Sequence, residues 1–165
     1  MYKRQVVTVD PKPGNPIEWR GVTTVKPNRA EAFACAGIDD ANREAGVHPL
    51  RDEPLLAAGR ALLKKWACSQ VLLTLGELGM LVFSNEEPPA HIPAKAREVF
   101  DVSGAGDTAI AVYTLGLCSG LSAQVAARIS NLASSIVVGK LGTTPIEREE
   151  LRDAISLNFP DGIPL

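Results

Sequence analysis

Residues 70–75, Gln-Val-Leu-Leu-Thr-Leu, form an apolar run of strand length directly after the clearest helical pattern in the chain. That pattern covers residues 54–67 and puts four large apolar side chains on one face of a helix with 3.6 residues per turn. These side chains belong to Leu55, Leu62, Leu63 and Trp66. An apolar strand that follows an amphipathic helix is typical of a parallel sheet covered on both faces. The two segments therefore predict an α/β protein.

Strand and helix patterns alternate over the rest of the chain. The expected strands cover residues 5–9, 22–25 and 80–83, with an extended segment at 98–100. The expected helices cover residues 29–36, 107–119 and 121–139. A last helix is expected to begin in a capping box, with Thr144 as N-cap, Pro145 at N1 and Glu147 at N3.

The connections predict how the strands pair. Residues 76–79 and the proline-rich segment 84–96 resemble hairpin connections, which join antiparallel neighbours. Strands that alternate with helices favour parallel pairing elsewhere. We therefore expect one α/β domain whose sheet is mostly parallel, with an antiparallel edge.

The composition and charge exclude several classes of protein. The chain has 165 residues, 45% of them hydrophobic, which suits one domain with a single core. Its 17 Lys and Arg nearly balance its 19 Asp and Glu, so no net positive charge attracts it to nucleic acid or anionic lipid. No apolar stretch approaches the roughly 20 residues of a membrane span, and Met1–Arg4 leads into no signal-peptide core. These observations predict a cytoplasmic protein that binds neither nucleic acid nor membrane.

Three cysteines are scattered along the chain, at Cys35, Cys68 and Cys118. Their number and spacing suit neither a disulfide framework nor a CxxC metal site. Free cysteines are usually buried, so we expect three buried thiols in a reducing compartment.

A glycine-rich turn, residues 103–107 (Ser-Gly-Ala-Gly-Asp), lies where an extended segment is expected to become a helix. Glycines adopt backbone angles closed to other residues and let a ligand approach the main chain. The free N–H groups of the first helical turn then point at one spot, which favours an anion. A carboxylate at Asp107 is unusual beside a simple phosphate site. It is suited to accept a proton from a hydroxyl that attacks phosphorus.

Three interpretations of this turn compete. It is a tightly packed helix start with Asp107 as a favourable first-turn acid, a dinucleotide-binding fingerprint, or a phosphoryl-transfer site with Asp107 as the base. A dinucleotide site expects an acidic residue about 20 positions further on, and residues 108–146 contain no Asp or Glu. The chain also lacks the G-x-x-x-x-G-K-[ST] pattern of a Walker A loop. The first and third interpretations remain.

The second signature of the ribokinase-like (PfkB) carbohydrate kinases closely resembles residues 101–108, Asp-Val-Ser-Gly-Ala-Gly-Asp-Thr. The wider stretch 91–155 is similar to the kinase domain of bacterial D-glycero-β-D-manno-heptose 7-phosphate kinases. Three upstream segments occur in the family's order and spacing, so the resemblance covers nearly the whole chain. These segments are 10–12 (Asp-Pro-Lys), 26–31 (Lys-Pro-Asn-Arg-Ala-Glu) and 74–79 (Thr-Leu-Gly-Glu-Leu-Gly).

The resemblance implies a ribokinase-like three-layer α/β/α sandwich and an ATP-dependent sugar kinase that uses Mg²⁺. It implies that Asp107 is the base for the sugar hydroxyl and that Gly104, Ala105 and Gly106 form the anion hole for the γ-phosphate. The implied substrate is heptose 7-phosphate, converted to heptose 1,7-bisphosphate in ADP-heptose formation for the lipopolysaccharide core.

Further roles follow from the same resemblance. Asn28 and Glu31 match the N-x-x-E motif that holds Mg²⁺ through water, and Lys12 would approach the nucleotide phosphates. Other residues would line the nucleotide, with the last of them near the adenine: Thr74, Gly76, Gly79 and Asn131. Asp101 and Ser103 match positions at which some relatives hold a monovalent cation such as K⁺.

Some of these residues have a structural interpretation beside the functional one. Asn28 and Glu31 also fit the N-cap and N3 positions of a capping box, and the two interpretations can coexist. Lys12 taken alone is a solvated loop lysine, and residues 74–76 taken alone are a strand end with a turn.

The resemblance is to the C-terminal half of such kinases, so we expect the N-terminal half, which contacts the substrate and forms the lid, to be absent from residues 1–165. A sheet without its leading strands has an unpaired edge, which favours self-association as a homo-oligomer. The favoured hypothesis is the nucleotide-binding and catalytic half of a sugar kinase. The alternative is a non-catalytic nucleotide-binding or assembly fragment with the kinase fold.

Overall fold

The structure is a computed structural model that describes residues 5–15, 17–41, 46–95 and 100–164. The chain forms two compact units, Met1–Ile92 and Pro93–Leu165, and each has its own elements and core. Strands and helices alternate in the first unit and helices make up the second, so the α/β class predicted from the sequence is confirmed. Of the expected extended segment 98–100, residues 98 and 99 lie outside the described residues, as do residues 1–4.

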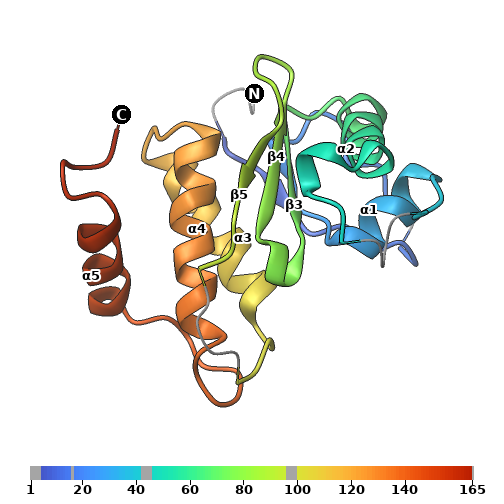
Figure 1. Cartoon of the computed structure of the whole chain (residues 1–165). Helices are drawn as coiled ribbons and strands as arrows, with labels where there is room; N and C mark the ends of the chain where they lie inside the picture. The colour runs from blue at the N-terminus through green and yellow to red at the C-terminus, as the bar shows by residue number, and fades with distance from the viewer. Residues whose placement is uncertain (1–4, 16, 42–45, 96–99, 165) are drawn as a thin grey trace. The chain divides into compact units, whose positions relative to one another are not determined.

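The first unit is built on a five-stranded sheet in the order β1-β2-β3-β4-β5 (Figure 1). The strands β1, β2 and β3 are parallel, whereas β3, β4 and β5 are antiparallel. Their bounds are Thr8–Val9, Thr24–Val25, Gln70–Thr74, Met80–Ser84 and Ala90–Ile92. The predicted antiparallel edge is therefore confirmed, but it includes two of the four strand pairings, so the sheet is evenly mixed. Its last strand, β5, lies within the segment expected to be only a proline-rich connection.

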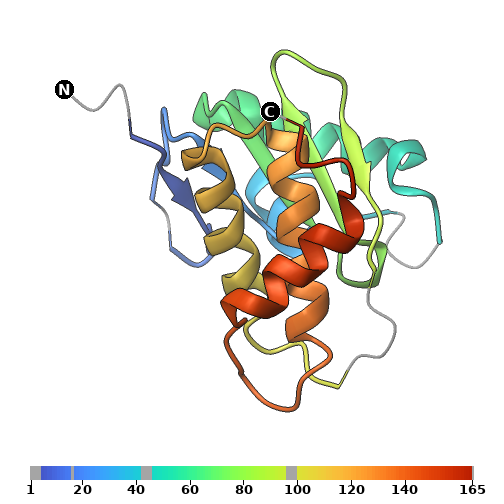
Figure 2. The ribbon, with the colours of Figure 1, turned by 90° about the vertical axis from the view of Figure 1, so that its left-hand side faces the viewer.

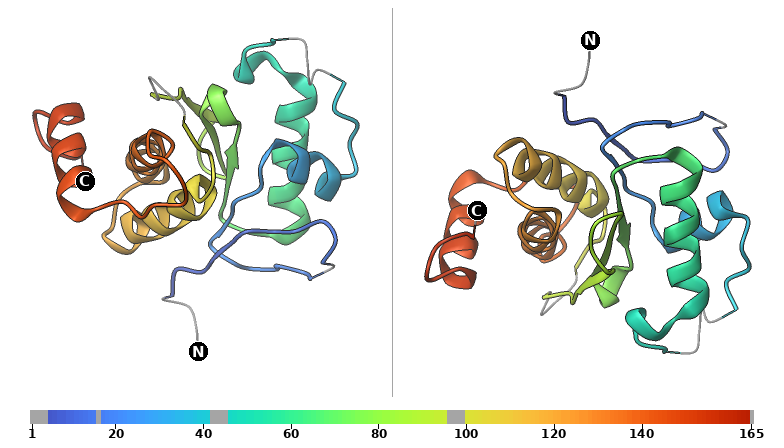
Figure 3. Two further views of the ribbon diagram at one scale, coloured as in Figure 1. Left: turned by 90° about the horizontal axis from the view of Figure 1, so that it is seen from below. Right: turned by 90° about the horizontal axis from the view of Figure 1, so that it is seen from above.

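Helices α1 (Arg29–Ala36) and α2 (Glu53–Trp66) connect β2 to β3 and pack on one face of this sheet, as Figures 1 and 3 show. The four apolar residues predicted for one face of α2 are all buried there. They join inward-facing side chains of β3 and β4, including Leu73 and Phe83, in the core of the unit. Gly59 of α2 lies so close to the sheet that a Cβ built on it would be 2.3 Å from Phe83 Cζ.

The second unit consists of three helices, α3 (Ala105–Cys118), α4 (Ala123–Val137) and α5 (Arg148–Asn158). Figures 2 and 3 show α4 between the other two. Helices α3 and α4 approach closely at Gly116, where an added Cβ would lie 2.9 Å from Ala126 Cβ. The unit has its own apolar core, built from Val112, Val125, Ile129, Leu132, Ala133 and Phe159.

The start of α5 differs from the predicted one. Its N-cap is Glu147, and the capping box joins Glu147 to Glu150, whose Oε2 accepts from the Glu147 amide at 2.8 Å. The Thr144 hydroxyl instead donates to the carbonyls of Leu141 and Gly142 in the preceding loop. The physical reason is the side chain of Ile146, which packs against the core together with Leu151 and so fixes the chain before the helix as a hydrophobic staple.

The cysteines also differ from the prediction. All three are free thiols, but only Cys68 is buried, while Cys35 is half-buried and Cys118 is exposed at the end of α3. Among the described residues, no helix combines the length and the apolar character needed to cross a membrane.

Candidate active site

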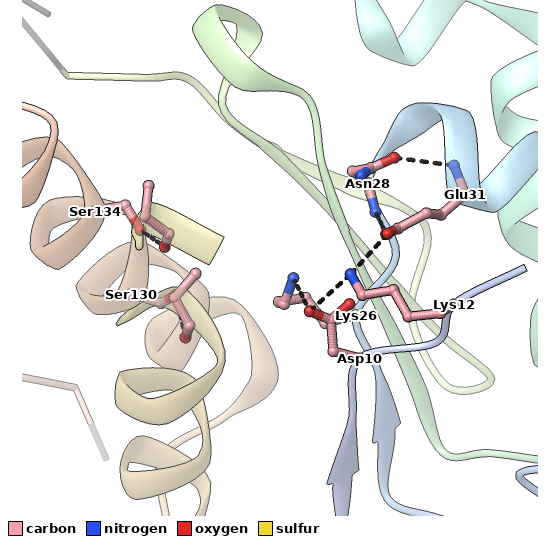
Figure 4. Close-up of polar contacts among 9 residues, drawn as sticks. Asp10, Lys12, Lys26, Asn28, Glu31, Ser130 and Ser134 are labelled. Carbon is pink, nitrogen blue, oxygen red and sulfur yellow. Dashed lines mark hydrogen bonds and ion pairs between the residues drawn. The ribbon is translucent and has the colours of Figure 1, made fainter. Parts of the chain in front are cut away.

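Charged and polar side chains gather where β1 and β2 end (Figure 4). Asp10 directly follows β1, and Lys26 directly follows β2. Ligands of open α/β sheets commonly bind beyond the carboxyl ends of parallel strands. This edge of the first unit is therefore a candidate ligand site.

Asn28 and Glu31 form a reciprocal cap at the start of α1. The Glu31 amide donates to Asn28 Oδ1 at 2.9 Å, and the Asn28 amide donates to Glu31 Oε2 at 2.8 Å. The predicted capping box is confirmed, and its geometry fixes the carboxylate of Glu31 at the end of β2. The side chain of Glu31 is 12% exposed, so its position is set by the fold.

Lys12 and Lys26 both pair with acidic side chains of this cluster. Lys12 Nζ lies 2.8 Å from Glu31 Oε1 and 3.4 Å from Asp10 Oδ2. Lys26 Nζ lies 3.5 Å from the same Asp10 oxygen. The hydrogen bond with Glu31 raises the pKa of Lys12 above its ordinary value. Lys12 thus pairs with two carboxylates of the cluster, although its side chain is 60% exposed.

One carboxylate oxygen of Asp10 has no hydrogen-bond partner among the residues that the structure describes. Its Oδ1 is buried, and no hydrogen-bond donor lies within reach of it in the described part of the chain. A buried carboxylate oxygen without a donor is costly and commonly marks the place of a bound water or ion. Carboxylate and amide oxygens with bound water are the ligands that Mg²⁺ prefers. The oxygens of Asp10, Asn28 and Glu31 fit a hydrated divalent cation, although no group of three or more His, Cys, Asp or Glu side chains forms a direct metal site among the described residues.

The turn after β3 lies next to this cluster. Thr74 forms a parallel bridge to Asn28, and its amide donates to Pro27 O at 3.0 Å. Gly76 and Gly79 then adopt φ angles of 60° and 87°. The turn is closed by the Leu75 amide, which donates to Gly79 O at 2.8 Å, and by the Gly79 amide, which donates to Gly76 O at 3.0 Å. Three of the residues expected along the nucleotide therefore lie in the same unit as Lys12, Asn28 and Glu31.

The second unit contains the glycine-rich turn, at the start of α3. Gly104 is the N-cap with φ of 80°, and no side chain of the described residues caps the helix. The Ala105 amide donates to Val102 O at 3.2 Å, so it is partly used inside the protein. Within the described residues the amides of Gly106 and Asp107 have no acceptor. Two adjacent free N–H groups at a helix start can bind an anion.

Asp107 is exposed in the first turn of α3. The position of this turn is fixed from α4, because the Ser134 hydroxyl donates to Ala105 O at 3.2 Å and the Ser130 hydroxyl donates to Ala109 O at 2.8 Å (Figure 4). These two serines are one helical turn apart and bond two carbonyls that are one turn apart. The helix start is thereby fixed without using its free amides.

Asp101 and Ser103 form a closed turn before α3. The Ser103 amide donates to Asp101 Oδ1 at 2.8 Å. Hydrogen bonds from Ser103 and from the Gly142 amide lower the pKa of Asp101 below its ordinary value. The loop that contains Gly142 also approaches the turn at Thr143, whose Cγ2 would lie 3.1 Å from a Cβ built on Gly104.

Asn131, expected near the adenine, lies in α4 and is 6% exposed. Its amide donates to Pro93 O at 2.8 Å. This bond anchors α4 to the segment that precedes the glycine-rich turn, so Asn131 has a structural partner within its own unit.

Asp10 and Lys26 are members of the cluster to which the sequence motifs assign no role. Their position in the sequence could have indicated such a role, because each of these charged residues directly follows a strand. Their pairing joins residues 16 positions apart, which neither helical nor strand periodicity reveals.

Known proteins similar to this chain support a kinase fold. "Bifunctional protein HldE" of Pelobacter propionicus is 39% identical over 155 residues, which cover 94% of this chain and 30% of that protein. "Bifunctional protein HldE" of Stutzerimonas stutzeri is 41% identical over 150 residues, covering 90% of this chain and 29% of that protein. The chain thus spans about three tenths of the length of these curated relatives.

Among solved structures, ribokinase from Thermotoga maritima has a TM-score of 0.76 and 23% identity, over 93% of this chain and 50% of that one. Adenosine kinase from Sinorhizobium meliloti has a TM-score of 0.64 and 29% identity, over 83% of this chain and 36% of that one. These similarities confirm the ribokinase-like fold. The pfkB family of carbohydrate kinases matches residues 10–150, and the chain belongs to that family.

Proposed function

We propose that this chain is the nucleotide-binding and catalytic part of an ATP-dependent kinase that phosphorylates a hydroxyl of a sugar phosphate. The observation that carries the proposal is the start of α3, where the amides of Gly106 and Asp107 are free and the Asp107 carboxylate is exposed. Free amides at a helix start stabilise the charge of a transferred phosphoryl group. A carboxylate beside them supports proton removal from the attacking alcohol.

In this mechanism the sugar hydroxyl oxygen attacks the γ-phosphorus in line, the bond from the γ-phosphorus to the β,γ-bridging oxygen breaks, and ADP leaves. Asp107 accepts the hydroxyl proton, while backbone N–H groups of residues 104–106 donate to the phosphoryl oxygens. Because the Ala105 amide is shared with Val102 O, we expect Gly106 and its neighbour to be the stronger donors. Phosphoryl transfer depends mainly on positioning and charge stabilisation, which a rigid helix start supplies.

The first unit would bind the nucleotide phosphates. Lys12 would donate to phosphate oxygens, and Asn28 and Glu31 would hold Mg²⁺ through its water molecules. When bound, Mg²⁺ neutralises part of the phosphate charge. Thr74, Gly76 and Gly79 would lie along the nucleotide, and Asn131 would lie near the adenine.

The proposal for the specific substrate is supported by the relatives. Their name, HldE, belongs to proteins of ADP-heptose formation, so we propose heptose 7-phosphate as the acceptor and heptose 1,7-bisphosphate as the product, in the pathway to the lipopolysaccharide core. A cytoplasmic location fits this pathway. A homo-oligomer through the sheet edge stays a prediction, as does a K⁺ ion at Asp101 and Ser103.

Calorimetry with ATP and Mg²⁺, followed by a turnover assay with heptose 7-phosphate, tests the proposal. Binding with turnover supports a kinase. Binding without turnover favours the alternative, a nucleotide-binding or assembly fragment. Repeating the assay with K⁺ replaced by a larger organic cation tests the monovalent site, since a K⁺-dependent enzyme loses activity in that buffer.

A further inference from the structure

Lys26 is the only buried cation among the described residues. It is 3% exposed, and its Nζ pairs with Asp10 Oδ2 at 3.5 Å. Burial of an ammonium group is costly unless an opposite charge lies close to it. Neither the proposed base nor the proposed metal ligands need this residue, so its burial calls for an explanation.

Lys26 is the inner end of a row of alternating charges. The row runs from Lys26 to Asp10, then to Lys12 and Glu31, and Figure 4 shows these contacts as one connected set. Both lysines approach the same Asp10 oxygen. The four charges sum to zero, so the row carries no net repulsion toward a polyphosphate.

The outer lysine is the one that a ligand can reach. The side chain of Lys12 is 60% exposed, whereas that of Lys26 is 4% exposed. Lys26 can therefore affect a bound phosphate only through the residues in front of it. Without the charge of Lys26, the remaining three side chains, Asp10, Glu31 and Lys12, have a net charge of −1. Asp10 also loses one of the two ammonium groups that orient its carboxylate.

We propose, on the basis of the proposed function, that Lys26 is a positioning residue for the nucleotide phosphates. It neutralises and orients Asp10, and Asp10 in turn holds the Lys12 ammonium in place beside Glu31. The phosphates then meet a fixed cation whose charge is not cancelled by an excess of carboxylates.

The test compares Lys26→Met with Lys64→Met in calorimetry of the whole chain. Lys64 is an exposed lysine of α2, so its variant removes the same charge outside the cluster. We expect Lys26→Met to weaken Mg²⁺–ATP binding about tenfold, because Asp10 then no longer holds the Lys12 ammonium in place beside the phosphates. Adenosine, which has no phosphate, should bind both variants as it binds the wild type. An equal loss for adenosine and ATP would show that Lys26 only stabilises the fold and would overturn the proposal.

A double-mutant cycle with Lys12→Met tests the route through Lys12. In that background, Lys26→Met should change ATP affinity by less than about twofold, because the cation that it positions is already gone. If Lys26→Met weakens ATP binding tenfold both with and without Lys12→Met, the proposal is overturned.

Two further outcomes separate this inference from the proposed function. If the wild-type chain binds no ATP, the proposed function fails and the inference fails with it. If the wild type binds ATP and Lys26→Met binds it equally well, only the inference fails. Should Lys26→Met not fold, as judged by circular dichroism, Lys26→Gln takes its place under the same criteria.

Discussion

Arg29 Nη2 lies 2.8 Å from Asp52 Oδ2, and the side chain of Asp52 is 1% exposed. Arg29 begins α1 directly after Asn28, and Asp52 is the N-cap of α2, where its Oδ1 accepts from the Leu55 amide. Arg29 also donates to both oxygens of Asp40. This ion pair therefore links the helix that carries the proposed metal motif to the helix that packs beside it.

Arg29→Met should destabilise the fold strongly, because it removes a cation that pairs with the buried Asp52 carboxylate at 2.8 Å. Breaking a buried ion pair on one side costs about 3–5 kcal/mol. Urea denaturation monitored by circular dichroism measures the change in the free energy of unfolding. As a control, Arg20→Met breaks the exposed pair with Glu18 and should cost less than about 0.5 kcal/mol. Equal decreases in the free energy of unfolding for the two variants would show that the burial of Asp52 does not increase the contribution of its ion pair to stability.

Gly59→Ala should destabilise the first unit although alanine favours helices. The new Cβ would lie 2.3 Å from Phe83 Cζ, so the aromatic ring or α2 must shift. Overpacking of this kind costs about 1–3 kcal/mol, and a contact as short as 2.3 Å favours the upper part of that range, which exceeds the roughly 1 kcal/mol gained in helix propensity. Thermal unfolding should show a lower Tm for Gly59→Ala. Adding Phe83→Leu to Gly59→Ala should make the decrease in Tm caused by Gly59→Ala smaller than it is in the wild-type background. An equally large decrease in both backgrounds would contradict a steric cause.

Gly104→Ala should destabilise the glycine-rich turn at the start of α3. Gly104 has φ of 80°, and an added Cβ would lie 3.1 Å from Thr143 Cγ2. A left-handed backbone angle costs a residue with a Cβ roughly 1–2 kcal/mol. We expect a lower Tm and weaker binding of Mg²⁺–ATP. Gly14→Ala is the matched control, because its Cβ meets nothing within 4 Å, and a similar loss in that variant would refute the explanation.

Asp107→Asn should lower turnover far more than nucleotide affinity. A lost general base typically costs about 10²–10⁴-fold in rate, while an exposed carboxamide leaves the free amides of α3 in place. Steady-state kinetics with ATP and a sugar phosphate measure kcat, and calorimetry measures ATP binding. Unchanged turnover would remove Asp107 from the mechanism.

The pH dependence of stability should report on Glu150. Hydrogen bonds from Lys140 and from the Glu147 amide lower the pKa of Glu150 below its ordinary 4.5. A carboxyl whose pKa is lower in the folded state contributes stability above its unfolded pKa, and this contribution is lost as pH falls through the folded pKa. The Tm difference between wild type and Glu150→Gln should therefore be constant from about pH 7 to about pH 5 and shrink below about pH 4.5.

Glu86→Gln, an exposed change between β4 and β5, is the control for that series. A Tm difference for Glu150→Gln that persists at the lowest pH would show that the carboxylate form is not what Lys140 stabilises.

Local signals along the chain determine much of the first unit. The bounds of α1 agree with the prediction, and its capping box at Asn28 and Glu31 is present because both partners lie within one helical turn. The buried face of α2 and the strand at 70–74 follow from spacing within a single element. The glycine turn also begins a helix, at Ala105. The roles of Asp107 and the other site residues stay predictions.

The tertiary structure decided the features that depend on distant partners. β5 exists only because Ala90–Ile92 pairs with β4, and its short, proline-flanked sequence gives no strand pattern. The start of α5 is set by packing of Ile146 in the core, against a local signal that favoured Thr144. The pairing of Asp10 with Lys26, and the exposure of Cys118, likewise depend on which elements meet. Hydrogen bonds within one turn and the spacing of apolar residues involve residues that are close in sequence, so the sequence predicts them. Burial and ion pairing depend on residues that are distant in sequence and meet only in the folded chain.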